Sequence, residues 1–345
     1  MSSKRMRVGL VIAAVAAIGA LSATAVAGTM AKGKSHKLTT VRVGLALIPP
    51  KMTFIGFYVA RDRGFFKKVG LDVKLMGEGD GVKSLRGTAA GAFDMAGTSA
   101  DDVIAAAAQG GGLSSVWGYA MPLDTAIVAD QSVKTVADLK GKKIAITDPG
   151  GFSDVQVRAV LAQAHINASD ASIISFSSRS AFVPAIVAGQ INAAPFHVDD
   201  GYAAQEQDPN LHVVAPVYKS LARWWYGSLA VTDAYKASHP TTIAKFITAM
   251  IRADRWIYSH RAATIAIGVK ETQESRSAVT QAYDFLKKAH EWTVNDGLEK
   301  SRVMFTMRFE HKLGQIPKVP AYNDVADVSI VNGVLAALGR WKTGY

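Results

Sequence analysis

The chain has 345 residues, 49% of them hydrophobic, which is enough to bury the cores of two globular domains and excludes a disordered protein. Lysine and arginine outnumber aspartate and glutamate by 39 to 28, so the chain is basic, and it contains no cysteine. The missing cysteine excludes disulfides, a cysteine nucleophile, thiolate metal sites and a lipid-modified N-terminal cysteine.

The first 27 residues have the pattern of a secretory signal peptide. Three basic residues come before an apolar run over 8–21, and Ala-Val-Ala at 25–27 resembles a cleavage site. An uncleaved membrane anchor is the alternative, but the run is shorter than the roughly 20 residues that a bilayer span needs. We therefore expect 1–27 to be removed and 28–38 to be a flexible leader of an exported, soluble protein without a lipid anchor, located in the periplasm or another extracytoplasmic space.

From residue 41 onwards, short β-rich runs alternate with segments of helical spacing. This alternation predicts an α/β protein with mostly parallel sheets flanked by helices. A nine-residue echo, AAGAFDMAG at 89–97 and VAGQINAAP at 187–195, indicates two similar lobes. After Pro240 the chain has the pattern of long packing helices. Strands are predicted over 41–48, 71–75, 93–96, 113–119, 144–146, 173–176, 191–194 and 226–231, and helices over 56–69, 81–90, 100–109, 153–164 and 181–188.

The motifs of enzymes and of nucleotide-binding proteins are missing. The glycine-rich turn at 77–82 misses the dinucleotide fingerprint because Val82 stands at the third glycine position. The eight histidines form no metal-binding motif, and there is no nucleophile elbow and no P-loop. The basic stretch 59–75 has the pattern of a solvated helix face, so we expect no nucleic-acid partner. The sequence thus predicts no catalytic residue, metal or cofactor.

Small polar residues follow two predicted strands at the point where a helix begins. They are Thr98-Ser99 and Gly150 to Ser153. Ligands of open α/β sheets bind at the carboxyl ends of the strands, where free N–H groups at a helix start favour an accepting group. Ser99 with Asp102, and Ser153 with Gln156, also fit the capping box. Each serine is therefore a candidate helix cap, a candidate ligand contact, or both.

Five short motifs, taken in series, resemble the substrate-binding proteins of ABC importers of the nitrate, sulfonate and taurine type, which are related to proteins that bind thiamine-pyrimidine precursors. The motifs are FYVA at 57–60, RGFFKKVGLDV at 63–73, AGAFDMA at 90–96, DLKGKKIA at 138–145 and AGQINAA at 188–194. The resemblance implies a two-lobed periplasmic-binding-protein fold of type II, with two crossing strands as its hinge. Lobe 1 would comprise 39–126 and 228–345, and lobe 2 would comprise 127–227.

The resemblance also implies a cleft between the lobes that closes on a ligand. Asp101 and Asp102 depart from an anion receptor, because a carboxylate that faces the cleft would repel a simple anion and hold an amine. Together with the aromatic residues this favours an organic solute, such as a sulfonate, a taurine-like compound or a pyrimidine or aromatic compound, over nitrate. The implied ligand contacts are Phe54, Phe57, Thr98, Ser99, Tyr119, Gly151, Phe152, Ser153, Phe196, His197 and Trp225.

The function that follows from the resemblance is that of an exported receptor without enzymatic activity. It would capture the small solute, act as a monomer and dock transiently on an ABC permease in the membrane. Two alternatives stay open at this point. One is an enzyme on the same fold, of the pyrimidine-precursor or menaquinone-pathway type, and the other is a ligand-sensing module of a signalling receptor.

Overall fold

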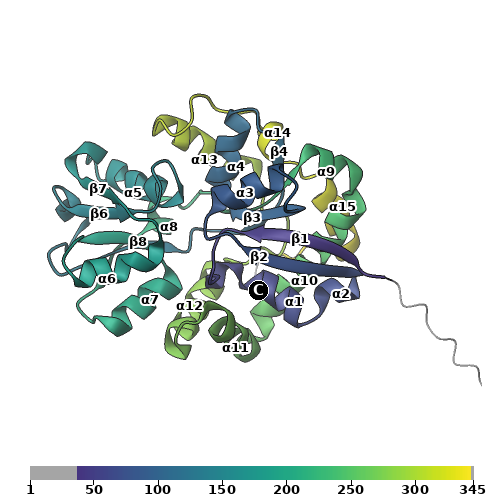
Figure 1. Cartoon of the computed structure of the whole chain (residues 1–345), viewed down its shortest axis with the longest axis horizontal. Coiled ribbons are helices and arrows are strands. Elements are labelled where there is room, and N and C mark those ends of the chain that lie inside the picture. Colours follow the sequence, from purple (N-terminus) through teal and green to yellow (C-terminus); the bar gives the residue numbers. More distant parts are fainter. Residues whose placement is uncertain (1–36, 343–345) are drawn as a thin grey trace, which may run out of the picture. The chain divides into compact units, whose positions relative to one another are not determined.

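The computed structural model describes residues 37–342, so the predicted signal peptide (1–27) and most of the predicted leader lie outside the described residues. Two five-stranded sheets, each flanked by helices, make up the two lobes (Figure 1). We call the sheet of order β2-β1-β3-β10-β4 with its helices lobe 1, and the sheet of order β7-β6-β8-β5-β9 with its helices lobe 2. The strands are β1 (Thr39–Leu45), β2 (Leu71–Gly77), β3 (Met95–Ser99), β4 (Leu113–Ala120), β5 (Thr125–Ala129), β6 (Lys143–Ile146), β7 (Ser172–Ser175), β8 (Ala193–His197), β9 (His212–Pro216) and β10 (Gly227–Thr232).

Both sheets are mostly parallel, as predicted. In each sheet one strand, β10 or β5, runs antiparallel to its two neighbours, and the other four strands share one direction. The reversed strand is in each case the first one after the chain has crossed from the other lobe. Strands β3 and β8 occupy the same central place in the two sheets, so the echo between 89–97 and 187–195 falls on equivalent strands.

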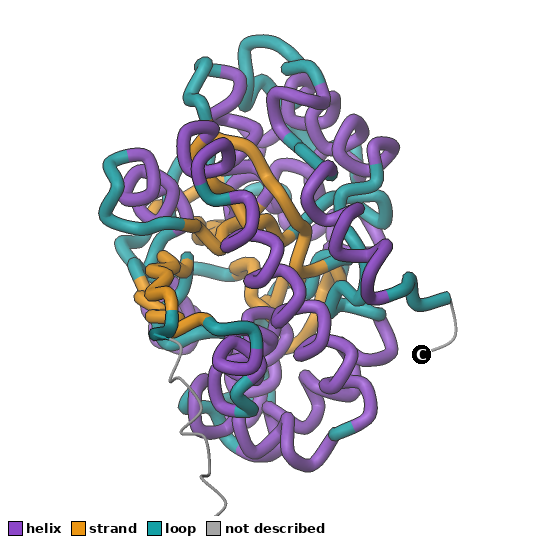
Figure 2. Tube along the Cα trace, turned by 90° about the vertical axis from the view of Figure 1, so that its right-hand side faces the viewer, coloured by secondary structure: helices purple, strands orange, loops and turns teal. Residues whose placement is uncertain are grey.

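Helices cover both faces of each sheet. In lobe 1, α3 and α4 lie on one face and α1, α2 and α10 on the other (Figure 1), and Figure 2 shows the strands running between the helices. The helices are α1 (Ile55–Asp62), α2 (Phe65–Lys68), α3 (Gly81–Ala89), α4 (Ala100–Ala108), α5 (Phe152–Gln163), α6 (Phe182–Val187), α7 (Val198–Gln207), α8 (Val217–Ser220), α9 (Asp233–Ser238), α10 (Pro240–Ser259), α11 (Arg261–Thr272), α12 (Arg276–Ala289), α13 (Lys300–Lys312), α14 (Tyr322–Val325) and α15 (Ser329–Leu338). Single turns of 3-10 helix are η1 (Met52–Phe54), η2 (Val136–Leu139), η3 (Ala168–Asp170) and η4 (Arg179–Ala181).

Local chemistry explains most element boundaries. Strand β1 buries Val41, Val43 and Leu45 completely, and a buried aliphatic side chain of this size contributes about 1.5–3 kcal/mol. The predicted single helix over 56–69 is wrong in one respect: Gly64 has φ +71 and separates α1 from α2. Gly70 has φ +83 and ends the second helix in the left-handed conformation, as the sequence predicts.

The chain crosses between the lobes twice, at 121–124 between β4 and β5 and at 221–226 between α8 and β10. Strand β9 and helix α7 of lobe 2 were not predicted. The start of α7 follows directly on His197 at the end of β8, and its first turn contains Asp199 and Asp200. No helix among the described residues has the length and apolar character that a bilayer crossing requires.

Candidate functional site

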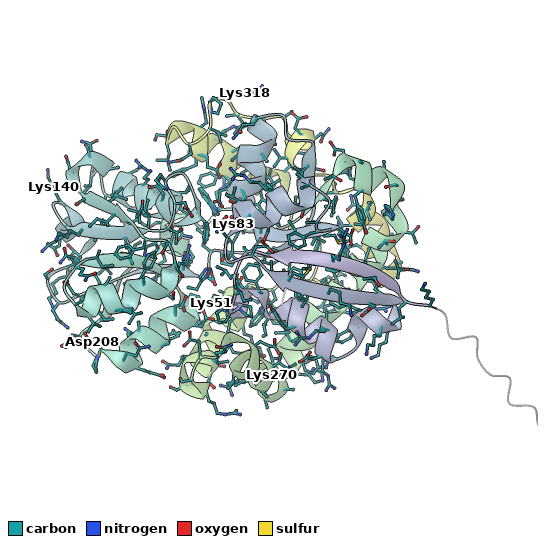
Figure 3. The ribbon with its side chains drawn as sticks, in the orientation of Figure 1. Lys51, Lys83, Lys140, Asp208, Lys270 and Lys318 are labelled. Atoms are coloured by element: carbon teal, nitrogen blue, oxygen red, sulfur yellow. The ribbon has the colours of Figure 1, made fainter. Side chains whose placement is uncertain are left out.

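The loop that follows β1 contacts the first turn of α7, which joins lobe 1 to lobe 2. The Met52 N–H donates to Asp199 Oδ2 at 2.9 Å. The Lys51 ammonium lies 2.5 Å from Asp200 Oδ1 and 3.4 Å from Glu274 Oε1, and Figure 3 labels Lys51. These five residues are called the inter-lobe latch below. Both polar contacts across the lobes are made to carboxylates in the first turn of α7, where a negative charge offsets the positive end of the helix dipole.

The charges of the latch shift one another. Burial alone would lower the pKa of Lys51, but the carboxylates of Asp200 and Asp199 outweigh it and raise that pKa. Burial raises the pKa of Asp199 to about 6, although Lys51 opposes the shift. The Oδ1 atom of Asp199 is buried and accepts no hydrogen bond. The latch therefore contains an ion pair between Lys51 and Asp200, and one oxygen of its Asp199 carboxylate can still accept a hydrogen bond.

A second cluster links the two crossings. His197 Nδ1 donates to the carboxylate of Asp124, with distances of 2.8 and 3.0 Å to its two oxygens, and the Tyr226 hydroxyl lies 3.4 Å from the same nitrogen. Asp124 ends the first crossing and Tyr226 ends the second, and all three side chains are buried. Burial raises the pKa of the Tyr226 hydroxyl well above its ordinary value, so it remains a hydrogen-bond donor. Because Nδ1 of His197 is committed to Asp124, the predicted role of this residue as a ligand contact rests on the other side of the ring.

Phe152 brings lobe 2 onto the second crossing. Its ring stacks on Tyr226, with centroids 5.1 Å apart and planes at 13°, and it lies 6.2 Å from the His197 ring. The Arg179 guanidinium lies over the same phenylalanine, 5.5 Å from the ring centroid. This places a flat aromatic surface and a cation next to one another at the strand ends of lobe 2.

Arg179 is a residue that the sequence reasoning missed. It begins η4, between β7 and α6, and its Nη1 donates only to the Pro195 carbonyl, at 3.5 Å. Among the residues that the structure describes, no carboxylate lies within 4 Å of this guanidinium. Burial lowers the pKa of Arg179, yet a guanidinium stays charged. The sequence could have indicated Arg179 through topology. It follows the predicted parallel strand 173–176, and the loop after such a strand lies at the ligand-binding edge of the sheet.

Thr98 and Ser99 lie together at the end of β3, and their hydroxyls serve Asp102. Ser99 Oγ donates to Asp102 Oδ2 at 2.7 Å, and Thr98 Oγ1 makes a short hydrogen bond to the same oxygen. The predicted capping box at Ser99 is therefore wrong, because the hydroxyl donates to a carboxylate and accepts no backbone N–H at the start of α4. The single proton of Ser99 goes to Asp102, which leaves Asp101 without a hydrogen bond on either oxygen.

Asp101 is 4% exposed, and burial raises its pKa to about 8, with the charge of Asp102 as a second cause. Glu310 on α13 is also buried and influenced by both aspartates, and its pKa is raised well above the ordinary value. An acid in such surroundings takes up a cationic or hydrogen-bond-donating group readily, because that group replaces the lost water.

The other predicted ligand residues fall into two sets. Phe54, Phe57 and Tyr119 pack together, with Tyr119 at 5.2 Å from each of the other two rings, and the Tyr119 hydroxyl donates to the Thr98 carbonyl at 3.0 Å. They support the end of β3 from within the core of lobe 1. Gly151 precedes α5 as its N-cap, beside Phe152.

The remaining three predicted residues pack elsewhere. Ser153 is fully buried and accepts from the Thr147 N–H at 2.8 Å, so its predicted capping role is wrong. Phe196 packs edge-on against Phe182 in the core of lobe 2, with centroids 5.9 Å apart. Trp225 is fully buried in the cluster between α4 and α13. Alternation along β8 and the second crossing directs Phe196 and Trp225 into the cores.

The described residues contain no group of three or more His, Asp or Glu side chains placed to hold a metal ion. A cavity of about 500 Å³ lies at the first crossing, lined by 121–122, 293–297 and neighbouring residues. None of the predicted ligand residues lines it. We take as the candidate binding site the strand ends around Asp101, Phe152, Arg179 and Tyr226, and call it the inter-lobe site.

Comparison with known proteins supports the two-lobed architecture. YtlA of Bacillus subtilis (strain 168), provisionally described as a binding protein, is 22% identical over 304 residues, which cover 86% of this chain and 90% of YtlA. The alkanesulfonate-binding protein SsuA of Xanthomonas axonopodis pv. citri, solved with bound MOPS, superposes with a TM-score of 0.71 at 18% identity, covering 84% of this chain and 99% of SsuA. The periplasmic nitrate-binding protein NrtA of Synechocystis PCC 6803 gives a TM-score of 0.70 at 13% identity, with 88% of this chain and 90% of NrtA covered.

At these identities the two solved structures show the fold, which is that of periplasmic binding proteins. The family model described as NMT1/THI5 like matches residues 51–263. This match covers more than half of the chain, and the protein therefore belongs to the NMT1/THI5-like family.

Proposed function

We propose that this protein is an exported receptor that captures a small organic solute between its two lobes and delivers it to an ABC importer. The observation that carries the proposal is the unpaired Arg179 guanidinium at the strand ends of lobe 2, beside the stacked rings of Phe152 and Tyr226. An arginine fork suits the oxygens of a sulfonate, carboxylate or phosphate. The names of SsuA and NrtA, two proteins of the same fold, state that they bind alkanesulfonates and nitrate.

The aromatic rings favour an organic solute over nitrate. The Phe152 ring is partly exposed, and a ligand with an aromatic or aliphatic body would bury apolar area against it, which nitrate could not do. The solute classes that we propose are sulfonates, taurine-like compounds, and pyrimidine or aromatic compounds. Of the contacts predicted from the sequence, we propose that those at the end of β3, the start of α5 and the end of β8 contact the solute: Thr98, Ser99, Gly151, Phe152 and His197.

Transport requires export and docking, which belong to the same proposal. Residues 1–27 would direct export and be removed, and the mature protein would be a soluble monomer outside the cytoplasm. It would carry out no chemistry, and hinge closure around the solute would present both lobes to the permease. The crossings at 121–124 and 221–226 would supply the hinge.

A thermal-shift screen of the purified protein against sulfonates, taurine, pyrimidines, aromatic acids and nitrate tests solute capture. A solute at a hundred times its Kd adds about 2.7 kcal/mol of apparent stability, which raises the Tm clearly. We expect one chemical class to give shifts, Arg179→Gln to abolish them, and Lys140→Gln, on the exposed far side of lobe 2, to leave them unchanged. A folded protein that no compound stabilises would contradict the proposal.

Deletion of the gene in its host tests delivery. We expect loss of uptake of the radiolabelled solute found in the screen, with restoration by the wild-type gene. Normal uptake together with a lost transcriptional response to the solute would favour the sensory alternative. Turnover of the solute by the purified protein would favour the enzymatic alternative.

A further inference from the structure

Two ionisable groups of opposite kind at the inter-lobe site, the Asp101 carboxyl and the Arg179 guanidinium, have no ion-pair partner. Asp101 is 4% exposed and neither of its oxygens accepts a hydrogen bond. Arg179 is partly buried, its one hydrogen bond is a 3.5 Å contact to a carbonyl, and no described carboxylate lies within 4 Å of it. Among the described residues, Asp254 on α10 also leaves both carboxyl oxygens without a hydrogen bond. What distinguishes the inter-lobe site is that such an acid, Asp101, interacts electrostatically with a guanidinium that has no carboxylate partner.

A short series of contacts connects the two charges across the lobes. Arg179 lies over the Phe152 ring, Phe152 stacks on Tyr226, and the Tyr226 carbonyl accepts from the Ala100 N–H at 2.7 Å. Asp101 is the next residue after Ala100. Each charge also shifts the pKa of the other, since Arg179 lowers that of Asp101 and Asp101 raises that of Arg179. The two groups thus approach the same space from opposite lobes.

Leaving the buried Asp101 carboxyl and the partly buried Arg179 guanidinium without partners lowers the stability of the ligand-free protein. A buried polar group without a partner costs about as much as its lost hydration, and more when it is charged. A solute with one group for each charge would remove both penalties at once. A simple anion would satisfy Arg179 only and would be repelled by Asp101, Asp102 and Glu310 when they are ionised.

We propose that the solute is two-ended, with an acidic oxygen group that binds Arg179 and a nitrogen that donates hydrogen bonds to Asp101. This inference rests on the proposed function and narrows its solute class to compounds such as aminosulfonates and amino acids. Asp101 is then the residue that separates these solutes from plain sulfonates. The partly exposed ring of Phe152 contacts the body between the two ends.

Binding of the nitrogen has a consequence for protons. The carboxyl of Asp101 has a pKa of about 8 without ligand, so it holds a proton at pH 7. The groups that act on it include the Ser99 hydroxyl before its helix, Asp102 on its own helix, Glu310 on α13, the Tyr119 hydroxyl and Arg179. An ammonium group favours the ionised carboxylate, so its binding at pH 7 releases a proton into the buffer.

Isothermal titration calorimetry with two matched pairs tests the inference: taurine against ethanesulfonate, and 4-(aminomethyl)benzenesulfonate against benzenesulfonate. We expect the amine of at least one pair to bind about tenfold or more tighter than its amine-free partner, as a charge-assisted hydrogen bond predicts. Titration in two buffers of different ionisation enthalpy should show proton release for the amine alone. Asp101→Asn should remove both the preference and the proton release, while Arg179→Lys and Arg179→Gln should weaken both members of the pair.

The outcomes test the two-ended solute and the receptor function separately. Equal affinity within both pairs, or a preference that survives in Asp101→Asn, overturns the two-ended solute and leaves the receptor function standing. Binding of none of the four probes, and of none of the solutes in the thermal-shift screen, overturns the receptor function and this inference with it. Melting curves of the three variants guard against misfolding, and Asp101→Asn provides a positive check, because it should melt higher than the wild type at pH 8.

Discussion

Asp101 should lower the stability of the ligand-free protein, and the effect should grow with pH. Its folded-state pKa of about 8 lies above the ordinary value near 4, so the penalty is absent below pH 4, increases between pH 4 and 8, and is complete above pH 8. Asp101→Asn should therefore raise the unfolding free energy at pH 8 by about 1–3 kcal/mol, and by much less at pH 4.5. Urea unfolding at the two pH values measures the difference.

Asp94→Asn is the matched control for that prediction. Burial opposes ionisation of Asp94, but hydrogen bonds from Arg42 outweigh it and hold the pKa of Asp94 below its ordinary value. The stability that this pair supplies is present above pH 4 and is lost as pH falls, so Asp94→Asn should destabilise at pH 8. Two variants that change stability in the same direction at pH 8 would show that Asp101 has a partner.

The inter-lobe latch connects the loop after β1 in lobe 1 to helix α7 in lobe 2. Lys51→Met removes the ion pair between the β1 loop and the first turn of α7, whose side chains are 13% and 18% exposed. We expect a larger radius of gyration of the ligand-free protein in solution scattering, and a loss of solute affinity of about 1 kcal/mol, or about fivefold in Kd. Lys270→Met, which breaks contacts to Asp62 and Glu271 within lobe 1, should change neither quantity. An unchanged radius in Lys51→Met would show that the latch does not hold the lobes.

Glycine contacts between elements give a second prediction at this scale. A Cβ on Gly118 of β4 would lie 2.3 Å from the Gly297 carbonyl oxygen, and the Gly118 N–H donates to the Asp296 carbonyl at 2.9 Å. Gly118→Ala must separate these backbones and should cost at least about 1–3 kcal/mol of unfolding free energy. Gly333→Ala, on the exposed face of α15 with open space around it, should instead stabilise by about 0.5–1 kcal/mol. Denaturant titration of both variants checks the opposite signs.

The alternation of strands and helices along the chain followed from hydrophobic periodicity, because each buried strand is a short apolar run between turn residues. The order of the strands within each sheet was not predicted, and β9 and α7 were missed. The binding edge followed from topology, which located Thr98 and Phe152. What the sequence could not supply is the direction of individual side chains. Phe196 and Trp225 point into lobe cores, and Ser153 accepts a hydrogen bond from the Thr147 N–H just after β6. These directions depend on how each element is turned relative to the layers that it packs against. Arg179 stands alone between two serines, and only the three-dimensional arrangement shows that it lacks a partner.

At the scale of the whole molecule, the buried acids should set an acidic pH of maximum stability. Carboxylates held by cations or backbone N–H groups, whose pKa values are lowered, stabilise the fold above pH 4 and lose that contribution as pH falls; they include Asp62, Asp94, Asp130, Asp138 and Asp327. Buried acids whose pKa values are raised destabilise the fold increasingly above pH 4; they include Asp101, Asp199, Asp254, Glu291 and Glu310.

The two sets act in opposite directions on either side of a narrow window. As pH falls to about 4 and below, the unfolded chain binds more protons than the paired carboxylates of the folded chain, and stability falls. As pH rises above about 4, the buried acids hold protons that the unfolded chain has released, or must ionise without a partner, and stability falls again. We expect the Tm of the ligand-free protein, followed by calorimetry from pH 3 to 9, to peak at about pH 4 to 5. A saturating two-ended solute should move the peak towards neutral pH, because it pairs the Asp101 carboxylate, whereas a Tm that rises steadily to pH 8 without ligand would mean that water already solvates these acids.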